Sequence, residues 1–403
     1  MTLLSDIYDV TLKRGIRGAA KGGFVRPTVG EHFMTHMDFE NISSYHNPVF
    51  LTKITAPDGA ADDRFGVSVA VSDTKIVVGA NLDNTAGGTD AGSAYIFNTN
   101  GTYVTKIIAP DGYTTDWFGI SVAISDTKVV VGAPLNDDNG SASGSAYIFN
   151  TDGSYVTKIT APDGTASDYF GHSVAISNTK IIVGAYGSIS AYIFDTDGTY
   201  VTKISAPYVA EHFGYSVAIS DTKIVVGDNF NSDKGNDSGS AYIFNIDGTY
   251  VTKITAPDGA ANAYFGSSVA ISDTKIVVGA YLDDNAGGTD AGAAYIFNTD
   301  GTYVTKITAP DGAASDNFGY SVAVYDPKVV VGAYGENEKG TRSGSAYIFN
   351  TSGAFVTKIT APDGAIDDRF GVSVAVSDTK AVVGAHLDDD KGAASGSAYI
   401  YDI

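Results

Sequence analysis

The sequence predicts an all-β fold, a closed seven-bladed β-propeller of four-stranded antiparallel blades, from three observations. The dipeptide Phe-Gly occurs seven times, in steps of 53, 52, 43, 52, 53 and 52 residues. Each copy is followed by short runs rich in Val, Ile and Tyr and bounded by turn residues, which is the pattern of β-strands. The repeat region opens with a lone fourth strand and closes with a lone third strand. The Phe-Gly pairs begin at Phe65, Phe118, Phe170, Phe213, Phe265, Phe318 and Phe370.

The first unit shows the four expected strands in order. Residues 67–72 form the first strand, and residues 75–80, which end in Gly-Ala, form the second. After a Gly- and Asp-rich loop, residues 94–97 form the third, and an Asn-Gly turn leads to the fourth at 103–107. No unit contains a ten-residue pattern of helical period. About 50 residues of four antiparallel strands, repeated seven times, are what a propeller requires.

The two ends of the repeat region indicate a closed ring. A fourth strand at about 50–56 precedes the first Phe-Gly, whereas the last unit stops after its third strand at 399–401. We expect the early strand to complete the last blade, because this pairing removes two exposed sheet edges. An open solenoid would need distinct capping repeats instead. The expected domains are therefore an extension at 1–49 and a propeller at 50–403.

The repeated motifs resemble those of a known family. Phe-Gly, then Ser-Val-Ala, then Val-Val-Gly-Ala, then Ser-Ala-Tyr-Ile-Phe resembles the FG-GAP repeats of integrin α-subunit propellers and of many bacterial surface proteins. Gly132-Ala133-Pro134 keeps the full Gly-Ala-Pro. Many integrin-type repeats also carry an Asp-x-Asp-x-Asp-Gly calcium loop between the first two strands. Here that connection is as short as Ser72-Asp73-Thr74, too short to surround Ca²⁺ with its 6–8 oxygens, so the family's calcium site is not carried over.

Composition limits the possible partners. The 403 residues include 46 acidic and 25 basic residues, a formal net charge of −21, and no Cys. Such an excess argues against nucleic acids and anionic membranes and leaves cations, basic proteins and neutral ligands such as glycans. Without Cys there is no disulfide, thiolate metal site or thiol nucleophile. We find no apolar run long enough for membrane insertion and no secretory signal. We expect a virion or an extracellular or cell-surface location.

The acidic residues concentrate in two sets of loops. Antiparallel order places the loops between second and third strands on the same side as the crossovers between units. These connections hold 29 acidic and six basic residues, a net of −23. The sequence thus predicts one strongly acidic face, able to meet a cell-surface glycan or protein.

Two interpretations of these loops stay open. Asp, Asn and Gly form tight turns and keep surfaces soluble. Several carboxylates within one flexible loop can also bind Ca²⁺. No cofactor is required by the sequence, and Ca²⁺ is the one it allows. The candidate metal ligands are Asp83, Asp90, Asp137, Asp138, Asp283, Asp284, Asp290, Asp388, Asp389 and Asp390.

The third unit differs because two of its connections are shortened, which explains the step of 43. The shortening predicts a gap in the acidic face near Tyr186, Tyr208 and His212, either a tolerated deletion or a notch for a sugar or a partner side chain.

Repeated side chains are expected to be structural. Each Phe of Phe-Gly should pack between blades, and each Gly should adopt a backbone conformation closed to other residues. One lysine recurs in every fourth strand, where an exposed edge lysine would hinder association between sheets. These lysines are Lys53, Lys106, Lys158, Lys203, Lys253, Lys306 and Lys358.

Catalysis finds no support in the sequence. No His pair has a metal-binding spacing such as His-Glu-x-x-His, and no Gly-x-Ser-x-Gly lies between a strand and a helix. We expect a non-enzyme, with no catalytic residues.

The extension at 1–49 shares nothing with the repeats. It carries the basic residues Lys13, Arg14, Arg17, Lys21 and Arg26. Strand order directs it away from the acidic loops, so we expect it to anchor the propeller on a larger assembly, unless it is a disordered leader. The sequence therefore predicts a non-catalytic binding, adhesion or structural propeller, for example a virion appendage. A calcium-dependent bacterial surface adhesin is the alternative.

Overall fold

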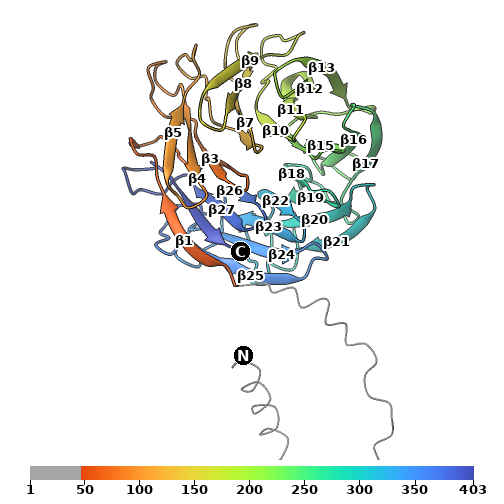
Figure 1. Ribbon diagram of the computed structural model, residues 1–403. Helices are drawn as coiled ribbons and strands as arrows, with labels where there is room; N and C mark the ends of the chain where they lie inside the picture. Colours follow the sequence, from red (N-terminus) through yellow and green to blue (C-terminus); the bar gives the residue numbers. More distant parts are fainter. Residues whose placement is uncertain (1–46) are drawn as a thin grey trace, which may run out of the picture. The chain divides into compact units, whose positions relative to one another are not determined.

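The computed structural model describes residues 47–403, and these form a seven-bladed propeller around a central channel (Figure 1). Within this range the only helical element is a three-residue 3₁₀ turn at Tyr186–Ser188. No helix of the described residues is long and apolar enough to cross a membrane. The predicted fold is confirmed.

Each of the first six blades contains four consecutive antiparallel strands. Blade 1 comprises β2 Ser68–Val71, β3 Lys75–Ala80, β4 Ser93–Asn98 and β5 Tyr103–Ile107; blade 2 comprises β6 Val122–Ile124, β7 Lys128–Ala133, β8 Ser145–Asn150 and β9 Tyr155–Ile159; blade 3 comprises β10 Ser173–Ile176, β11 Lys180–Ala185, β12 Ser190–Asp195 and β13 Tyr200–Ser205. Blade 4 comprises β14 Ser216–Ile219, β15 Lys223–Asp228, β16 Ser240–Asn245 and β17 Tyr250–Ile254; blade 5 comprises β18 Ser268–Ile271, β19 Lys275–Ala280, β20 Ala293–Asn298 and β21 Tyr303–Ile307; blade 6 comprises β22 Ser321–Tyr325, β23 Lys328–Ala333, β24 Ser345–Asn350 and β25 Phe355–Ile359.

Blade 7 joins the two ends of the repeat region, as predicted. It contains β26 Ser373–Val376, β27 Lys380–Ala385, β28 Ser397–Asp402 and, from the start of the ring, β1 Val49–Ile54. Strand β1 pairs antiparallel with β28, with Ile54 opposite Ala398. The contact between blades 7 and 1 resembles the others, since Ser373 Oγ donates to the carbonyl of Gly66 at 2.8 Å just as Ser68 Oγ donates to Gly119.

The Phe-Gly motif connects neighbouring blades. Phe65 is fully buried and packs edge-on against Tyr95 and Phe97, in a core that also includes residues of blade 7. The next residue, Gly66, has a φ of +91°, and a Cβ there would lie 2.3 Å from the carbonyl oxygen of Ser397. The predicted interblade Phe and strained Gly are both confirmed.

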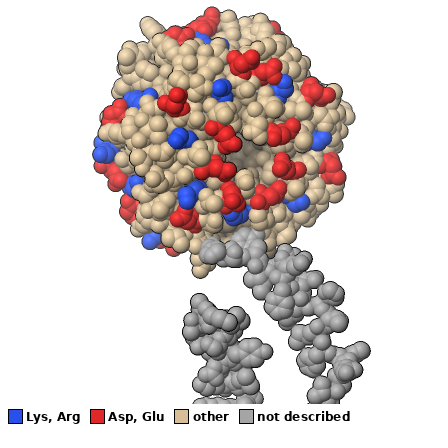
Figure 2. Space-filling model, viewed as in Figure 1, with Lys and Arg blue, Asp and Glu red and all other residues tan. Residues whose placement is uncertain are grey.

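The connections divide between two faces of the ring. The turn face carries the turns between first and second strands and between third and fourth strands. The loop face carries the loops between second and third strands and the crossovers between blades. On the turn face the channel opens through a cavity of about 520 Å³ whose lining includes Asp73, Asp126, Asp221 and Asp273, and Figure 2 shows the acidic side chains around this opening.

Candidate functional site

The lysines of the fourth strands are partly buried members of a polar network on the loop face, so the expectation of exposed edge lysines is wrong. In blade 1, Lys106 lies over the ring of Tyr95, with Nζ 5.2 Å from its centroid. The ammonium pairs with Asp58 of the crossover and with Asp83 of the loop, both at 2.7 Å. The Tyr95 hydroxyl shares its proton between the same two carboxylates, at 2.8 Å from each. The side chain bends from the strand toward the loops because two carboxylates and an aromatic face lie there.

The same network recurs around the ring. Lys306 pairs with Asp258 and Asp283, both at 2.8 Å, and Lys53 pairs with Asp388 at 2.9 Å and Asp390 at 2.5 Å. Asp138 pairs with Lys158. Five of the ten candidate metal ligands therefore face a lysine ammonium, namely Asp83, Asp138, Asp283, Asp388 and Asp390.

The neighbouring acids of each loop turn toward backbone amides instead. Asp137 Oδ1 accepts from the N–H of Ala142 at 2.7 Å. Asp389 Oδ1 accepts from the N–H of Ala394 at 2.8 Å, and Asp284 Oδ1 accepts from the N–H of Asp290. Asp90 and Asp290 adopt left-handed backbone conformations, with φ of +53° and +55°. These contacts are those of turn-forming residues, and calcium binding by the loops stays a prediction.

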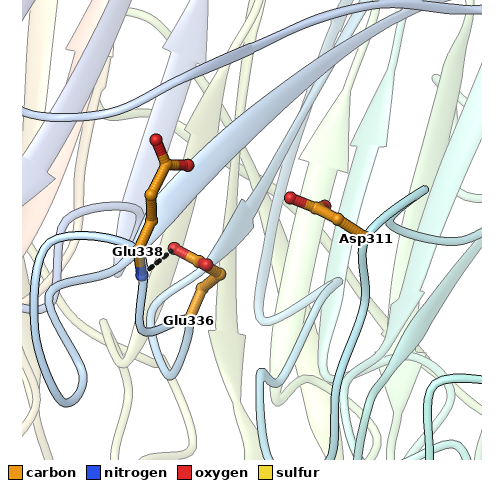
Figure 3. Close-up of side chains that lie close together, drawn as sticks. All are labelled: Asp311, Glu336 and Glu338. Atoms are coloured by element: carbon orange, nitrogen blue, oxygen red, sulfur yellow. Dashed lines mark hydrogen bonds between the residues drawn. The ribbon is translucent and has the colours of Figure 1, made fainter.

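One group of acids in blade 6, which is not among the predicted metal ligands, is as compact as a metal site. Asp311, Glu336 and Glu338 each offer a carboxylate oxygen within 4.8 Å of the others (Figure 3). Lys358 Nζ bridges all three, at 2.8, 3.2 and 2.7 Å respectively. A lysine ammonium thus supplies the positive charge that a metal ion would otherwise supply.

Electrostatics within the network favour the charged forms. Partial burial opposes ionisation of Asp58, but hydrogen bonds from Lys106 and Tyr95 outweigh it and lower the pKa of that carboxyl. Burial likewise opposes the charged form of Lys106, yet the hydrogen bonds to Asp58 and Asp83 raise its pKa. The seven strand lysines belong to the loop face, so the net charge of −23 expected there becomes −16.

The sequence carries a signal for this network in the crossovers. Six of the seven crossovers contain Ala-Pro-Asp-Gly, and the Asp of each accepts from the tyrosine hydroxyl of the following third strand at 2.8 Å. The crossover into blade 4 has Tyr208 at that position. The hydroxyl of Tyr242 consequently has no hydrogen-bond partner among residues 47–403.

The predicted notch brings two of its three residues together. Tyr186 and His212 lie with ring centroids 5.4 Å apart, whereas Tyr208 is 60% exposed and contacts Tyr250 at 6.2 Å. Tyr186 also stacks on Tyr169, with centroids 5.0 Å apart.

These rings belong to a larger feature that we call the aromatic arc. Consecutive members have ring centroids 4.1–5.9 Å apart and run from blade 3 to blade 6 along the loop-face end of the channel. All but Phe230 flank Phe-Gly or follow the Gly-Ala that ends the second strand. The arc consists of Tyr169, Tyr186, His212, Phe230, Tyr264, Tyr281, Tyr320 and Tyr334.

The expected anchor residues Lys13, Arg14, Arg17, Lys21 and Arg26 lie outside the described residues.

Comparison with protein families gives one result that bears on the rest of the chain. The model described as FG-GAP repeat matches residues 49–97, 102–149, 154–194, 203–244, 249–297, 302–349 and 354–401. No curated protein matches the chain significantly.

Proposed function

Because the chain belongs to the FG-GAP repeat family, whose propellers serve binding, adhesion or structural roles, we propose that it is a non-catalytic binding propeller that residues 1–49 anchor on a larger assembly, such as a virion appendage. The observation that carries this proposal is the distribution of unlike side chains. The buried second and third strands are nearly identical in all blades, whereas the positions around the loop-face opening differ from blade to blade. Repeated structure with one diversified surface is the arrangement expected of a binding scaffold.

The anchor is tested by removing it. Deletion of residues 1–46 keeps Val49 and the rest of β1, and so retains the strand that completes blade 7. In the source that produces the protein, the full chain should co-sediment with the assembly and the shortened chain should stay free, with an unchanged melting temperature. The triple variant Lys13→Glu, Arg17→Glu and Lys21→Glu tests the charge alone. Normal incorporation of the shortened chain would refute the anchoring role.

A calcium-dependent surface adhesin is the second candidate, supported by the close grouping of Asp311, Glu336 and Glu338. Calorimetric titration with CaCl₂ distinguishes the two proposed functions. The adhesin predicts calcium uptake and a higher melting temperature for the unmodified chain. Our first proposal predicts no uptake, because Lys358 neutralises the carboxylates, and calcium binding only after Lys358→Met exposes them.

A further inference from the structure

The loop-face end of the channel differs in charge from the loops around it. A cavity of about 390 Å³ opens there, a volume within the roughly 300–1,000 Å³ typical of small-molecule sites. Its polar lining includes Arg64, Arg369, His386, Tyr215 and Tyr320. None of the residues that line it is acidic, although the surrounding loops carry most of the protein's carboxylates.

The two arginines of this cavity are not paired with a carboxylate in the part of the chain that the structure describes. Neither Arg64 nor Arg369 forms an ion pair with any residue in 47–403. Arg369 Nε is buried without a hydrogen-bond partner in this range, and its guanidinium lies 5.5 Å from the centroid of Tyr334. Arg64 is exposed to solvent and Arg369 is half-buried, so the buried, unpartnered Nε of Arg369 is the group that points to a missing anion.

A third group points to the same missing partner. His386 is only 7% exposed, and its Nδ1 is buried with no hydrogen-bond partner among the described residues. Burial first, and then the nearby Arg369 and Arg64, lower the pKa of His386 to about 3, so the imidazole is neutral at physiological pH. A neutral imidazole adds a hydrogen-bonding group for a ligand without adding charge.

The remaining walls favour a ring-shaped ligand over a simple ion. Tyr320 and Tyr334 continue the aromatic arc into the cavity, with ring centroids 4.6 Å apart. Tyrosine rings pack against the C–H faces of sugars and their hydroxyls bind sugar hydroxyls. An isolated aspartate or glutamate side chain would leave most of the cavity unfilled, and the outer acidic loops would repel a polyanion.

We propose that this opening binds the terminal, carboxylate-bearing sugar of a glycan, with the carboxylate between Arg64 and Arg369 and the ring against Tyr320 and Tyr334. The inference rests on the proposed binding role and specifies its ligand. It places recognition at the channel, inside the acidic loops rather than on them.

The test is calorimetric titration of the full chain with glucuronate and with N-acetylneuraminate. Glucose and methyl glucuronate are the uncharged controls, acetate and phosphate are the anion controls, and a Glu-rich peptide represents a protein partner. We expect at least one acidic sugar to bind, and the uncharged sugars to bind at least tenfold more weakly. Arg369→Gln and Arg64→Gln should each weaken binding at least tenfold. Arg342→Gln, at an exposed arginine outside this cavity, should change nothing.

Four outcomes would overturn the inference: no binding of either acidic sugar, equal binding of the methyl ester, equal binding of acetate or phosphate, or binding of the peptide alone. Unchanged melting temperatures would show that the variants are folded. The titration uses the isolated chain, so its failure is distinct from a failure of anchoring. A neutral glycan that bound instead would preserve the binding role and refute only the acidic ligand.

Discussion

At the scale of the residue, tyrosine, lysine and carboxylate act as one unit in most blades. Tyr295 shows the complete arrangement, since its hydroxyl lies beneath Lys306 and shares its proton between Asp258 at 2.8 Å and Asp283 at 2.9 Å. A buried hydroxyl without such partners loses its hydrogen bonds to water and gains none in return, at a cost of about 1–3 kcal/mol. Blade 4 lacks the crossover Asp, so the unpartnered hydroxyl of Tyr242 destabilises the fold by about this amount.

Because of this difference, replacing the tyrosine by phenylalanine should change the free energy of unfolding in opposite ways in blades 4 and 5. Tyr242→Phe removes a buried hydroxyl that has no partner, so we expect the free energy of unfolding to stay constant or to rise by about 1 kcal/mol. Tyr295→Phe removes the hydroxyl proton that two carboxylates share and should lower it by about 1–3 kcal/mol. Chemical denaturation of both variants measures the two changes. Equal destabilisation would show that the network contributes nothing beyond ring packing.

At the scale of the element, the glycines of consecutive blades fix how closely neighbouring blades approach each other. Gly79 at the end of β3 lies where a Cβ would be 1.9 Å from the carbonyl oxygen of Gly119 in the next blade. Gly119 itself has a φ of +98°. Glycine is therefore required for two reasons: a left-handed backbone conformation at Gly119, and the close approach of the next blade's backbone at Gly79. Both reasons apply again at the other blades.

A methyl group at this joint should be poorly tolerated. In Gly119→Ala the new Cβ would lie 2.2 Å from the carbonyl oxygen of Ser93 in a left-handed conformation, so we expect a loss of about 2–4 kcal/mol in unfolding free energy. Gly364→Ala is the control, because its Cβ would meet nothing closer than 3.3 Å and its φ is not left-handed. Thermal unfolding followed by circular dichroism compares them. Similar melting temperatures would mean that the joint can relax.

Sequence reasoning was strongest for elements and weakest for side-chain directions. The strands, their order and the closure by residues 50–54 follow from local patterns and from the two unpaired ends. The partners of Lys106 do not, because Asp58 is 48 residues away and meets it only when the blade is assembled. The aromatic arc is likewise a product of ring geometry, since a residue after Gly-Ala in one unit becomes the neighbour of a residue beside Phe-Gly in the next unit.

At the scale of the whole molecule, the excess of acids opposes the fold at high pH in two ways. The acidic side chains that give the net charge of −21 repel one another, and some carboxylates are buried. Asp63 is 2% exposed, and burial raises its pKa to about 6 even though it accepts a hydrogen bond from the N–H of Ala60. Burial raises the pKa of Asp116, Asp316 and Asp368 as well. Carboxyls of this kind bind protons more tightly in the folded state, so their contribution is complete below about pH 4 and is lost as the pH rises through 6.

The crossover carboxyls act in the opposite direction. Hydrogen bonds from lysine and tyrosine, although opposed by partial burial, lower the pKa of Asp58 and Asp258. Their contribution is present above the unfolded pKa of about 4 and is lost on further acidification. The two groups together place the greatest stability of the fold in mildly acidic solution, between about pH 4 and pH 6.

We therefore expect the melting temperature to peak in that interval and to fall steadily toward pH 8. Asp63→Asn keeps an acceptor for the N–H of Ala60 but cannot ionise, so it should reduce the fall between pH 5 and pH 8. Sodium chloride at 0.5 M should raise the melting temperature more at pH 8 than at pH 5, because screening acts on the larger net charge. Differential scanning calorimetry across the pH range measures all three effects. A melting temperature that rose from pH 5 to pH 8 would show that neither the buried acids nor the net charge governs the stability of the ring, since the contribution of the lysine network is constant over this interval.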